Sequence, residues 1–279
     1  MSRLPWLRVA LGAAVALSCL GAKAETALDA QSKALFNKAT VALQAGAPGE
    51  AVSIFELLAD RGVVHPDVSF NRAVAYIKRA RADRAQPGDL GRAVAALEET
   101  LALRPSDAAA ETTLARVQSE LSRERSRRGA QSLLERPSLG RALVRLLPEN
   151  FWAFTTMMAS GVTTLGLLAA WLAGSPRRRY VGKVALAIAG VFGILSGTML
   201  HAASKMRHDL TPGVVTTPEA RLRDAAGLPL PASAGRDASS IPEGALVDIS
   251  RINDRYAEVL WGETKAWVQL SDLQVLPKR

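Results

Sequence analysis

The pattern of apolar and polar positions divides the chain around two long apolar stretches, residues 151–173 and 184–203, which contain no Asp, Glu, Lys or Arg. As helices rising about 1.5 Å per residue, each would match the roughly 30 Å hydrocarbon core of a bilayer. The polar segment between them, residues 174–183, is so short that it can join only adjacent antiparallel helices. The pattern predicts a transmembrane hairpin. The alternative, a buried hairpin of a soluble protein, lacks enough other apolar sequence to cover it.

A shorter apolar run, residues 9–17, lies at the N-terminus after two arginines and is followed by Ala22-Lys23-Ala24. This order is typical of a secretory signal peptide, here residues 1–24. An uncleaved anchor and a lipid on Cys19, the only cysteine, are the alternatives. Cleavage after Ala24 would leave a mature chain without a thiol.

A signal peptide also sets the orientation of the hairpin. The segment that follows it is exported, so the first apolar helix returns inward and the second goes out again. The segment 174–183, with its three consecutive arginines, is then cytoplasmic, in agreement with the positive-inside tendency. We therefore expect a bacterial inner-membrane protein whose N- and C-terminal domains are both periplasmic.

The first exported segment, residues 25–122, is rich in helix-forming residues and contains an internal repeat. Residues 36–39 recur as 70–73, displaced by 34, and residues 51–56 recur as 93–98, displaced by 42. A 34-residue period with two helices per unit resembles the tetratricopeptide repeat. The extra residues of the second unit fall in the polar stretch 80–88. We expect closely packed helix pairs, with small alanines at positions 39, 51, 73 and 93 between them.

The tetratricopeptide resemblance implies a concave surface lined by the first helix of each unit. In that family an asparagine there often binds the backbone of a peptide, and Asn37 and Asn71 stand at matching positions. An asparagine can donate and accept hydrogen bonds at once, as an extended peptide requires. Lys38 and Lys78 lie nearby and suit an acidic ligand. The alternative is that all four are solvated polar residues on helix surfaces.

Residues 123–150 form a basic and amphipathic segment before the first apolar helix. The arginine-rich sequence at its start is typical of a solvated helix face or linker, and contact with anionic lipid headgroups is the competing interpretation. The leucines near its end predict a short amphipathic helix in the bilayer surface. The net charge of +9 would also suit a nucleic-acid-binding protein. Export, and the lack of a basic face interleaved with aromatic residues, argue against nucleic acid.

Residues 204–279 begin as a Pro-, Ala- and Ser-rich linker or long loop and become strand-rich over 241–277. Three short strand patterns, a helical turn and a last strand follow one another, an order that resembles a bacterial SH3-like domain. Residues 214–223 match the first strand and long first loop of that family. We expect a small all-β barrel whose core contains Val247, Ile249, Val259, Val268 and Leu273.

The aromatic residues of the strand-rich part are its candidate ligand contacts. Tyr256, Trp261 and Trp267 could form a surface that binds a peptide or a glycan. For Trp267, packing in the core is the favoured alternative.

No pattern in the sequence indicates catalysis. The three histidines, His65, His201 and His208, are not spaced as metal ligands, and no phosphate-binding glycine loop or nucleophile motif occurs. We expect a non-enzyme without a metal or cofactor.

The complete order is that of a multi-domain membrane protein: tetratricopeptide-like repeats, a transmembrane hairpin and an SH3-like barrel. It resembles BatE-type proteins of the bacterial aerotolerance (Bat) operons. The resemblance implies protein partners, namely von Willebrand A-domain Bat proteins and, indirectly, a MoxR-type AAA+ ATPase, in envelope assembly or stress tolerance. The expected function is a scaffold for protein–protein interaction. The alternative is an envelope anchor whose SH3-like domain binds peptidoglycan.

Overall fold

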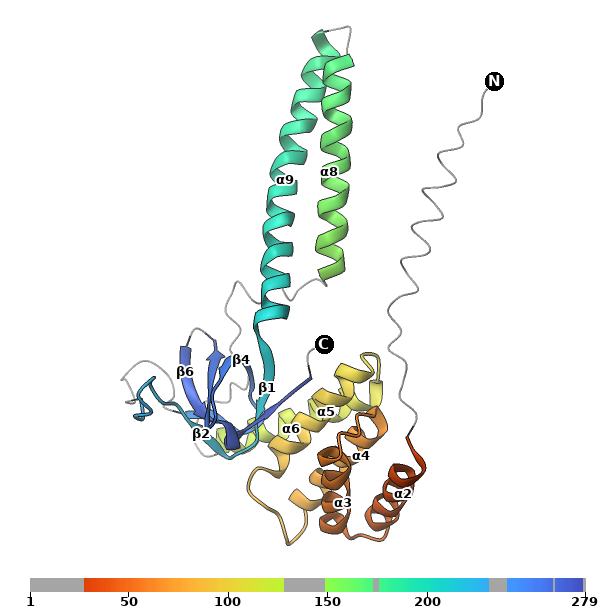
Figure 1. The fold of residues 1–279 in the computed structure, drawn as a ribbon, viewed down its shortest axis with the longest axis vertical. Coiled ribbons are helices and arrows are strands. Elements are labelled where there is room, and N and C mark those ends of the chain that lie inside the picture. Colours follow the sequence, from red (N-terminus) through yellow and green to blue (C-terminus); the bar gives the residue numbers. More distant parts are fainter. Residues whose placement is uncertain (1–27, 128–148, 173–175, 231–239, 263, 278–279) are drawn as a thin grey trace.

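The computed structural model describes residues 28–127, 149–172, 176–230, 240–262 and 264–277. The predicted signal peptide, most of the predicted juxtamembrane segment and the two terminal residues 278–279 lie outside this range. The described residues form a helical domain, a β-domain and a long two-helix hairpin (Figure 1). Both domains lie at the same end of the hairpin, as the hairpin prediction requires.

The helical domain consists of five helices in which each packs against the next along the chain. They are α2 (Ala30–Gln44), α3 (Pro48–Asp60), α4 (Pro66–Ala80), α5 (Asp89–Leu103) and α6 (Ala108–Arg127). Proline at the first position of α3 and of α4 fits the start of a helix, because its missing N–H would be unpaired there. The predicted boundary at residue 122 is wrong, since α6 continues to Arg127.

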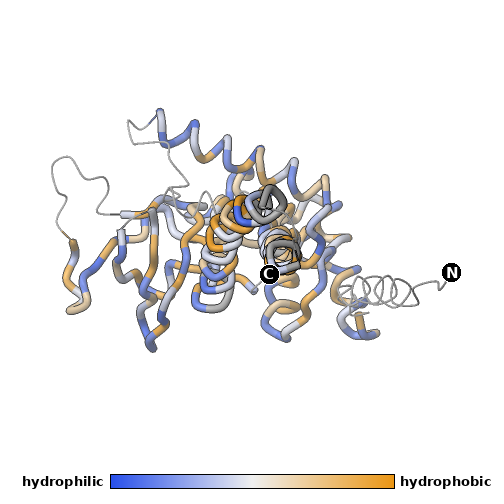
Figure 2. The backbone as a smooth tube through the Cα atoms, turned by 90° about the horizontal axis from the view of Figure 1, so that it is seen from above, coloured by the Kyte–Doolittle hydropathy of each residue, from blue (hydrophilic) through white to orange (hydrophobic). Residues whose placement is uncertain are grey.

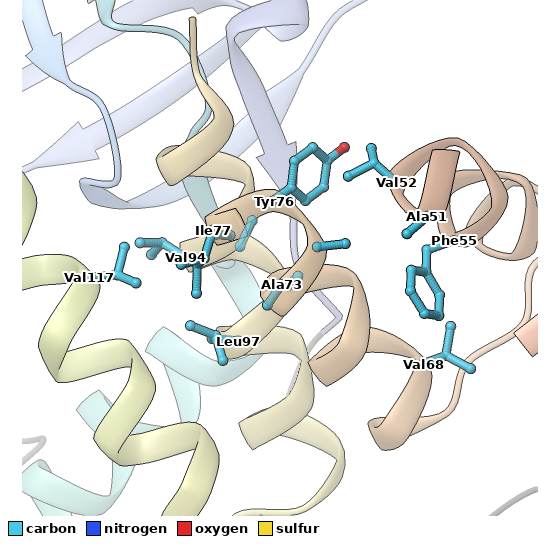
Figure 3. Packing of buried hydrophobic residues seen from close by; sticks show 14 of the residues in the cluster. Ala51, Val52, Phe55, Val68, Ala73, Tyr76, Ile77, Val94, Leu97 and Val117 are labelled. Carbon is cyan, nitrogen blue, oxygen red and sulfur yellow. The ribbon is translucent and has the colours of Figure 1, made fainter. Parts of the chain in front are cut away.

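Small residues hold the helices of this domain close together. The alanines at positions 39, 51, 73 and 93 are fully buried, as are Phe55 and Leu97. Figure 3 shows the large side chains between the helices, with Phe55 beside Val68 and with Leu97 and Val94 between α4 and α6. The predicted close packing at the four alanines is confirmed.

The hairpin consists of α8 (Glu149–Leu172) and α9 (Pro176–Asp209). Both helices are long and apolar enough to cross a membrane, and their apolar windows are only 11% and 12% buried. Seen from above, the hairpin rises between the two domains (Figure 2). A core hairpin of a soluble protein would instead bury most of its side chains.

Close contact between α8 and α9 occurs at glycines. A Cβ placed on Gly193 would lie 3.5 Å from the Cβ of Ala159, and one on Gly166 would lie 3.7 Å from the Gly182 carbonyl oxygen. The predicted loop over 174–183 is wrong from Pro176 onward, because α9 already begins there. Polar side chains mark where a membrane segment ends, but they do not end the helix that carries it.

The β-domain is a five-stranded antiparallel sheet, in the order β6-β5-β4-β1-β7, with a separate two-stranded pair, β2-β3. The elements are β1 (Thr211–Val215), β2 (Glu219–Arg221), β3 (Ser240–Pro242), β4 (Leu246–Ile252), β5 (Tyr256–Trp261), β6 (Thr264–Gln269), the 3₁₀ turn η2 (Leu270–Asp272) and β7 (Leu273–Val275). The five core residues predicted for this domain are all buried.

The predicted linker after the hairpin is wrong at its start. Helix α9 ends at Asp209, and β1 begins at Thr211. Pro212 fits into β1 because it stands next to the first residue of the strand, and its carbonyl accepts a hydrogen bond from the Leu276 N–H at 2.9 Å. The first strand, predicted from residue 214, therefore begins three residues earlier, at Thr211.

The two domains are packed against each other. Strand β1 contacts α5, and Val214 and Leu276 of the β-domain belong to the same buried apolar cluster as the helical core. This arrangement was not predicted from the sequence.

Candidate functional site

Four polar residues predicted as ligand contacts lie on α2 and α4, and we call them the α2–α4 row: Asn37, Lys38, Asn71 and Lys78. Helices α2 and α4 contact each other, and the Lys78 Nζ lies 3.4 Å from the Leu43 carbonyl oxygen near the end of α2. The two helices therefore end side by side. Their asparagines occupy equivalent positions, 34 residues apart.

The four residues of the row differ in how exposed their side chains are to a ligand. Asn37 and Lys38 are exposed on α2, and Lys78 is exposed on α4. Asn71 is half-buried, and its Nδ2 donates to the Asp67 carbonyl one turn earlier at 2.8 Å. One donor of this amide is thus occupied within the helix, while its oxygen remains available as an acceptor.

Polar side chains between α3, α4 and α5 fix the orientation of α4. Tyr76 donates through its hydroxyl to Glu56 Oε1 at 2.8 Å, and the buried Arg72 donates to Glu99 of α5. Burial raises the pKa of Tyr76 far above its ordinary value, and the Glu56 carboxylate raises it further. Tyr76 is therefore a hydrogen-bond donor at all physiological pH values. These contacts set the rotation of α4 and hence the direction of the row.

A second polar contact ties the end of α4 to the start of α5. Asp89, which is 2% exposed, accepts from Arg79 Nε at 3.0 Å, from Arg79 Nη2 at 2.5 Å and from the Gln86 N–H at 2.9 Å. The hydrogen bond with Asp89 raises the pKa of Arg79 above its ordinary value. This pair closes the polar stretch 80–88 into a fixed loop. Sequence reasoning located the loop but missed the pair that orders it.

A third polar contact joins the two domains. Glu243 of the β-domain accepts a hydrogen bond from the Gly91 N–H of α5 at 2.7 Å. Burial raises the pKa of Glu243, and the nearby carboxylates of Glu124 and Asp89 raise it further. The Gly91 N–H and the charge of Arg92 act in the opposite direction. The carboxyl of Glu243 is therefore easier to protonate than an exposed glutamate.

The predicted aromatic surface of the β-domain is not formed as expected. Trp261 is 5% exposed and lies in the core, so its assignment to a surface is wrong. Side chains alternate along a strand, and Trp261 shares the inward face of β5 with the buried Val259. Trp267 stands beside the buried Val268 on β6, points away from the core and is half-buried.

Tyr256 lies on the outside of the β-domain next to Arg223, whose guanidinium is 5.9 Å from the centre of the tyrosine ring. Residue Arg223 also pairs with the backbone of Trp267 through two hydrogen bonds of 2.8 and 2.9 Å. A shallow hollow beside Tyr256 is lined by Asp254, Arg255, Tyr256, Gln269, Leu270 and Ser271. Arg223 thus connects Tyr256 and Trp267 in one half-exposed patch.

Metal ligands are not gathered anywhere in the described ranges, where no group of three or more His, Cys, Asp or Glu could hold an ion. The amide groups of Asn37 and Asn71 in the α2–α4 row are of a kind that can hydrogen-bond to a polymer backbone. No family model, no curated protein and no solved structure matches the chain.

Proposed function

We propose that the protein is a non-enzymatic scaffold of the bacterial inner membrane, which holds a protein partner close to the bilayer through the α2–α4 row. The observation that carries this proposal is the position of both folded domains at one end of the apolar hairpin, with Asn37, Lys38 and Lys78 exposed. An exposed row of amides and ammonium groups on two neighbouring helices suits an extended, acidic segment of a partner.

The helix pairs and the sheet support the families suggested by the sequence. Two helix pairs with fully buried alanines between them are what a tetratricopeptide-like stack requires. The strand order with a 3₁₀ turn before the last strand suits an SH3-like barrel. We therefore propose a BatE-type protein, with both domains periplasmic, that acts with von Willebrand A-domain Bat proteins and a MoxR-type ATPase system.

The alternative, an anchor that binds peptidoglycan through the β-domain, has less support. It needs several aromatic rings on one surface, and Trp261 is buried. Only Tyr256 and Trp267 remain half-exposed for such a role.

A double alanine variant tests the proposal. A von Willebrand A-domain Bat protein is co-expressed, and its capture by the full-length protein is compared between wild type and Asn37→Ala/Asn71→Ala. Loss of two hydrogen bonds of about 1 kcal/mol each predicts a roughly 30-fold weaker interaction. The control, Ser53→Ala/Gln86→Ala, alters two exposed polar side chains outside the row. Equal capture by wild type and the double asparagine variant would reject the proposal.

A further inference from the structure

The helical stack ends in a helix that has no following helix among the described residues 28–127. Helix α5 packs against α4 and α6, and β1 of the β-domain contacts α5, whereas much of α6 is exposed. Val214, Leu276 and the partly buried Leu246 of the β-domain complete the apolar cluster of the helical core. Val214 is fully buried and Leu276 is 5% exposed. The β-domain thus completes the apolar cluster on the α5 side of the last helices of the stack.

The contact is a close approach of backbones, made possible by glycine. A Cβ on Gly91 of α5 would lie 2.7 Å from the Val215 carbonyl oxygen and 2.8 Å from Glu243 Cγ. A Cβ on Gly88 would lie 1.9 Å from the Thr216 carbonyl oxygen. From the other side, a Cβ on Gly244 would meet Leu121 of α6 at 2.5 Å. At Gly88 and Gly91 the nearest atoms are backbone carbonyl oxygens, so a larger residue at either position would move one domain, whereas at Gly244 the end of the Leu121 side chain can turn away.

Gly91 is informative because it lies in the first turn of α5, where its N–H has no acceptor within the helix and donates to Glu243 instead. Glycine still costs a helix more than alanine, at most about 1 kcal/mol. That cost has a physical reason here, since alanine would push β1 away and weaken the 2.7 Å hydrogen bond from Gly91 to Glu243. The loop 80–88, which is held by Asp89, places Gly91 at the contact between α5 and β1.

The strand that covers α5 is also the strand that continues the membrane helix. Leu210 alone separates the end of α9 at Asp209 from the start of β1 at Thr211. A rotation of β1 relative to α9 must therefore occur within one residue. The same strand is hydrogen-bonded on both sides, to β4 and to β7, so it cannot move apart from the sheet.

We propose that the β-domain is the end cap of the helical stack and fastens the stack to α9, so that both domains move as one body with the second membrane helix. In this role the β-domain is an internal structural partner, and its β1 and Glu243–Gly244 face is not available to other proteins. The proposal does not depend on what binds to the α2–α4 row.

Hydrogen exchange of the full-length protein in lipid nanodiscs tests this proposal. In Gly91→Ala the amides of β1 should exchange at least about tenfold faster than in wild type, because the strand loses its cover. The matched control is Gly49→Ala, also a helical glycine, whose added Cβ would have no neighbour within 4 Å. The control should leave β1 unchanged. Equal exchange of β1 in the two variants would overturn the proposal.

A second pair of substitutions, Val94→Ala and Val52→Ala, tests the proposal if Gly91→Ala does not fold. Val94 and Val52 are both buried in the helical core, but only Val94 approaches Gly244 of the β-domain, where a Cβ would lie 3.5 Å from its Cγ2. Val94→Ala should raise the exchange of β1, whereas Val52→Ala should raise only that of the helices around it. If the exchange of the β1 amides rises equally in both valine variants, or in neither, the proposal that the β-domain caps the stack is contradicted.

Discussion

The buried pair of Arg79 and Asp89 gives the sharpest test of the packing described above. The change is Asp89→Ala, which removes all three hydrogen bonds that the carboxylate accepts: two from the Arg79 guanidinium and one from the Gln86 N–H. Arg79, which is only 9% exposed, would be left without its anionic partner in a site with little access to water. The loop that presents Gly88 and Gly91 to the β-domain would lose its anchor.

The expected loss of stability in Asp89→Ala follows from the burial of the Arg79–Asp89 pair. Breaking a buried ion pair on one side costs about 3–5 kcal/mol, because a charge is left uncompensated. Total domain stability is about 5–15 kcal/mol, so this is a large fraction of it. Replacing both partners, as in Arg79→Leu/Asp89→Leu, should recover most of the loss because no buried charge remains.

The assay is hydrogen exchange of the α4 and α5 amides in the full-length protein, which reports on this region independently of the hairpin. A loss of about 3 kcal/mol or more predicts exchange at least roughly 150-fold faster in Asp89→Ala. The control is Glu120→Ala. Its partner Arg81 is 56% exposed and the two are 2.6 Å apart, so this pair should contribute less than about 1 kcal/mol.

Two outcomes would refute the reasoning on Asp89. One is an effect no larger than that of Glu120→Ala. The other is a double leucine variant that is as unstable as Asp89→Ala, since the cost would then not come from the uncompensated charge of Arg79.

Two further predictions concern the interdomain carboxyl and the membrane topology. Because the pKa of Glu243 is raised in the folded protein, stability should fall as pH rises from the ordinary value of 4.5 through the raised value. Glu243→Gln should remove this component of the pH dependence. A melting temperature that changes with pH in the same way in wild type and in Glu243→Gln, from about pH 4 to about pH 8, would contradict the prediction. If both domains are periplasmic, Ser53→Cys and Ser271→Cys should react with an impermeant maleimide in intact spheroplasts, and Arg178→Cys only after lysis. Labelling of Arg178→Cys before lysis would contradict the topology.

The helices and strands could be predicted because each rests on a local pattern. The repeated alanines at 39, 51, 73 and 93 follow the helical period, and all are buried. The short alternating runs of the β-domain gave five correct core residues. These signals involve neighbours in sequence, so no knowledge of tertiary contacts was needed.

The position of Trp261 could also have been predicted, by applying the same alternation consistently. Val259 was assigned to the core, and Trp261 stands two positions later on the same strand, so it must point the same way. The same argument places Trp267 opposite to Val268. Aromatic residues were assigned to a surface for their chemistry, although the strand period already determined their side.

The contacts between distant residues could not be predicted from a single sequence. Gly91 and Glu243 are 152 residues apart, and neither shows a local pattern that points to the other. Arg79 and Asp89 are ten apart, but they belong to different helices whose angle depends on the loop between them. A helical glycine at position 91 was an available signal of a close approach, because without such a contact alanine would be favoured there.

If α9 crosses a bilayer, as proposed, its length decides how far the two folded domains stand from that bilayer. Its 34 residues extend about 51 Å, roughly 20 Å more than the hydrocarbon core. Hydropathy located the apolar middle of this helix and missed both ends, because those ends are polar yet rich in helix formers. A helix that leaves the apolar layer without a break and enters a sheet after one residue acts as a rigid spacer. The distance of the β-domain from the membrane is therefore set by the number of residues in α9. The helical domain shares that distance because β1 packs against α5.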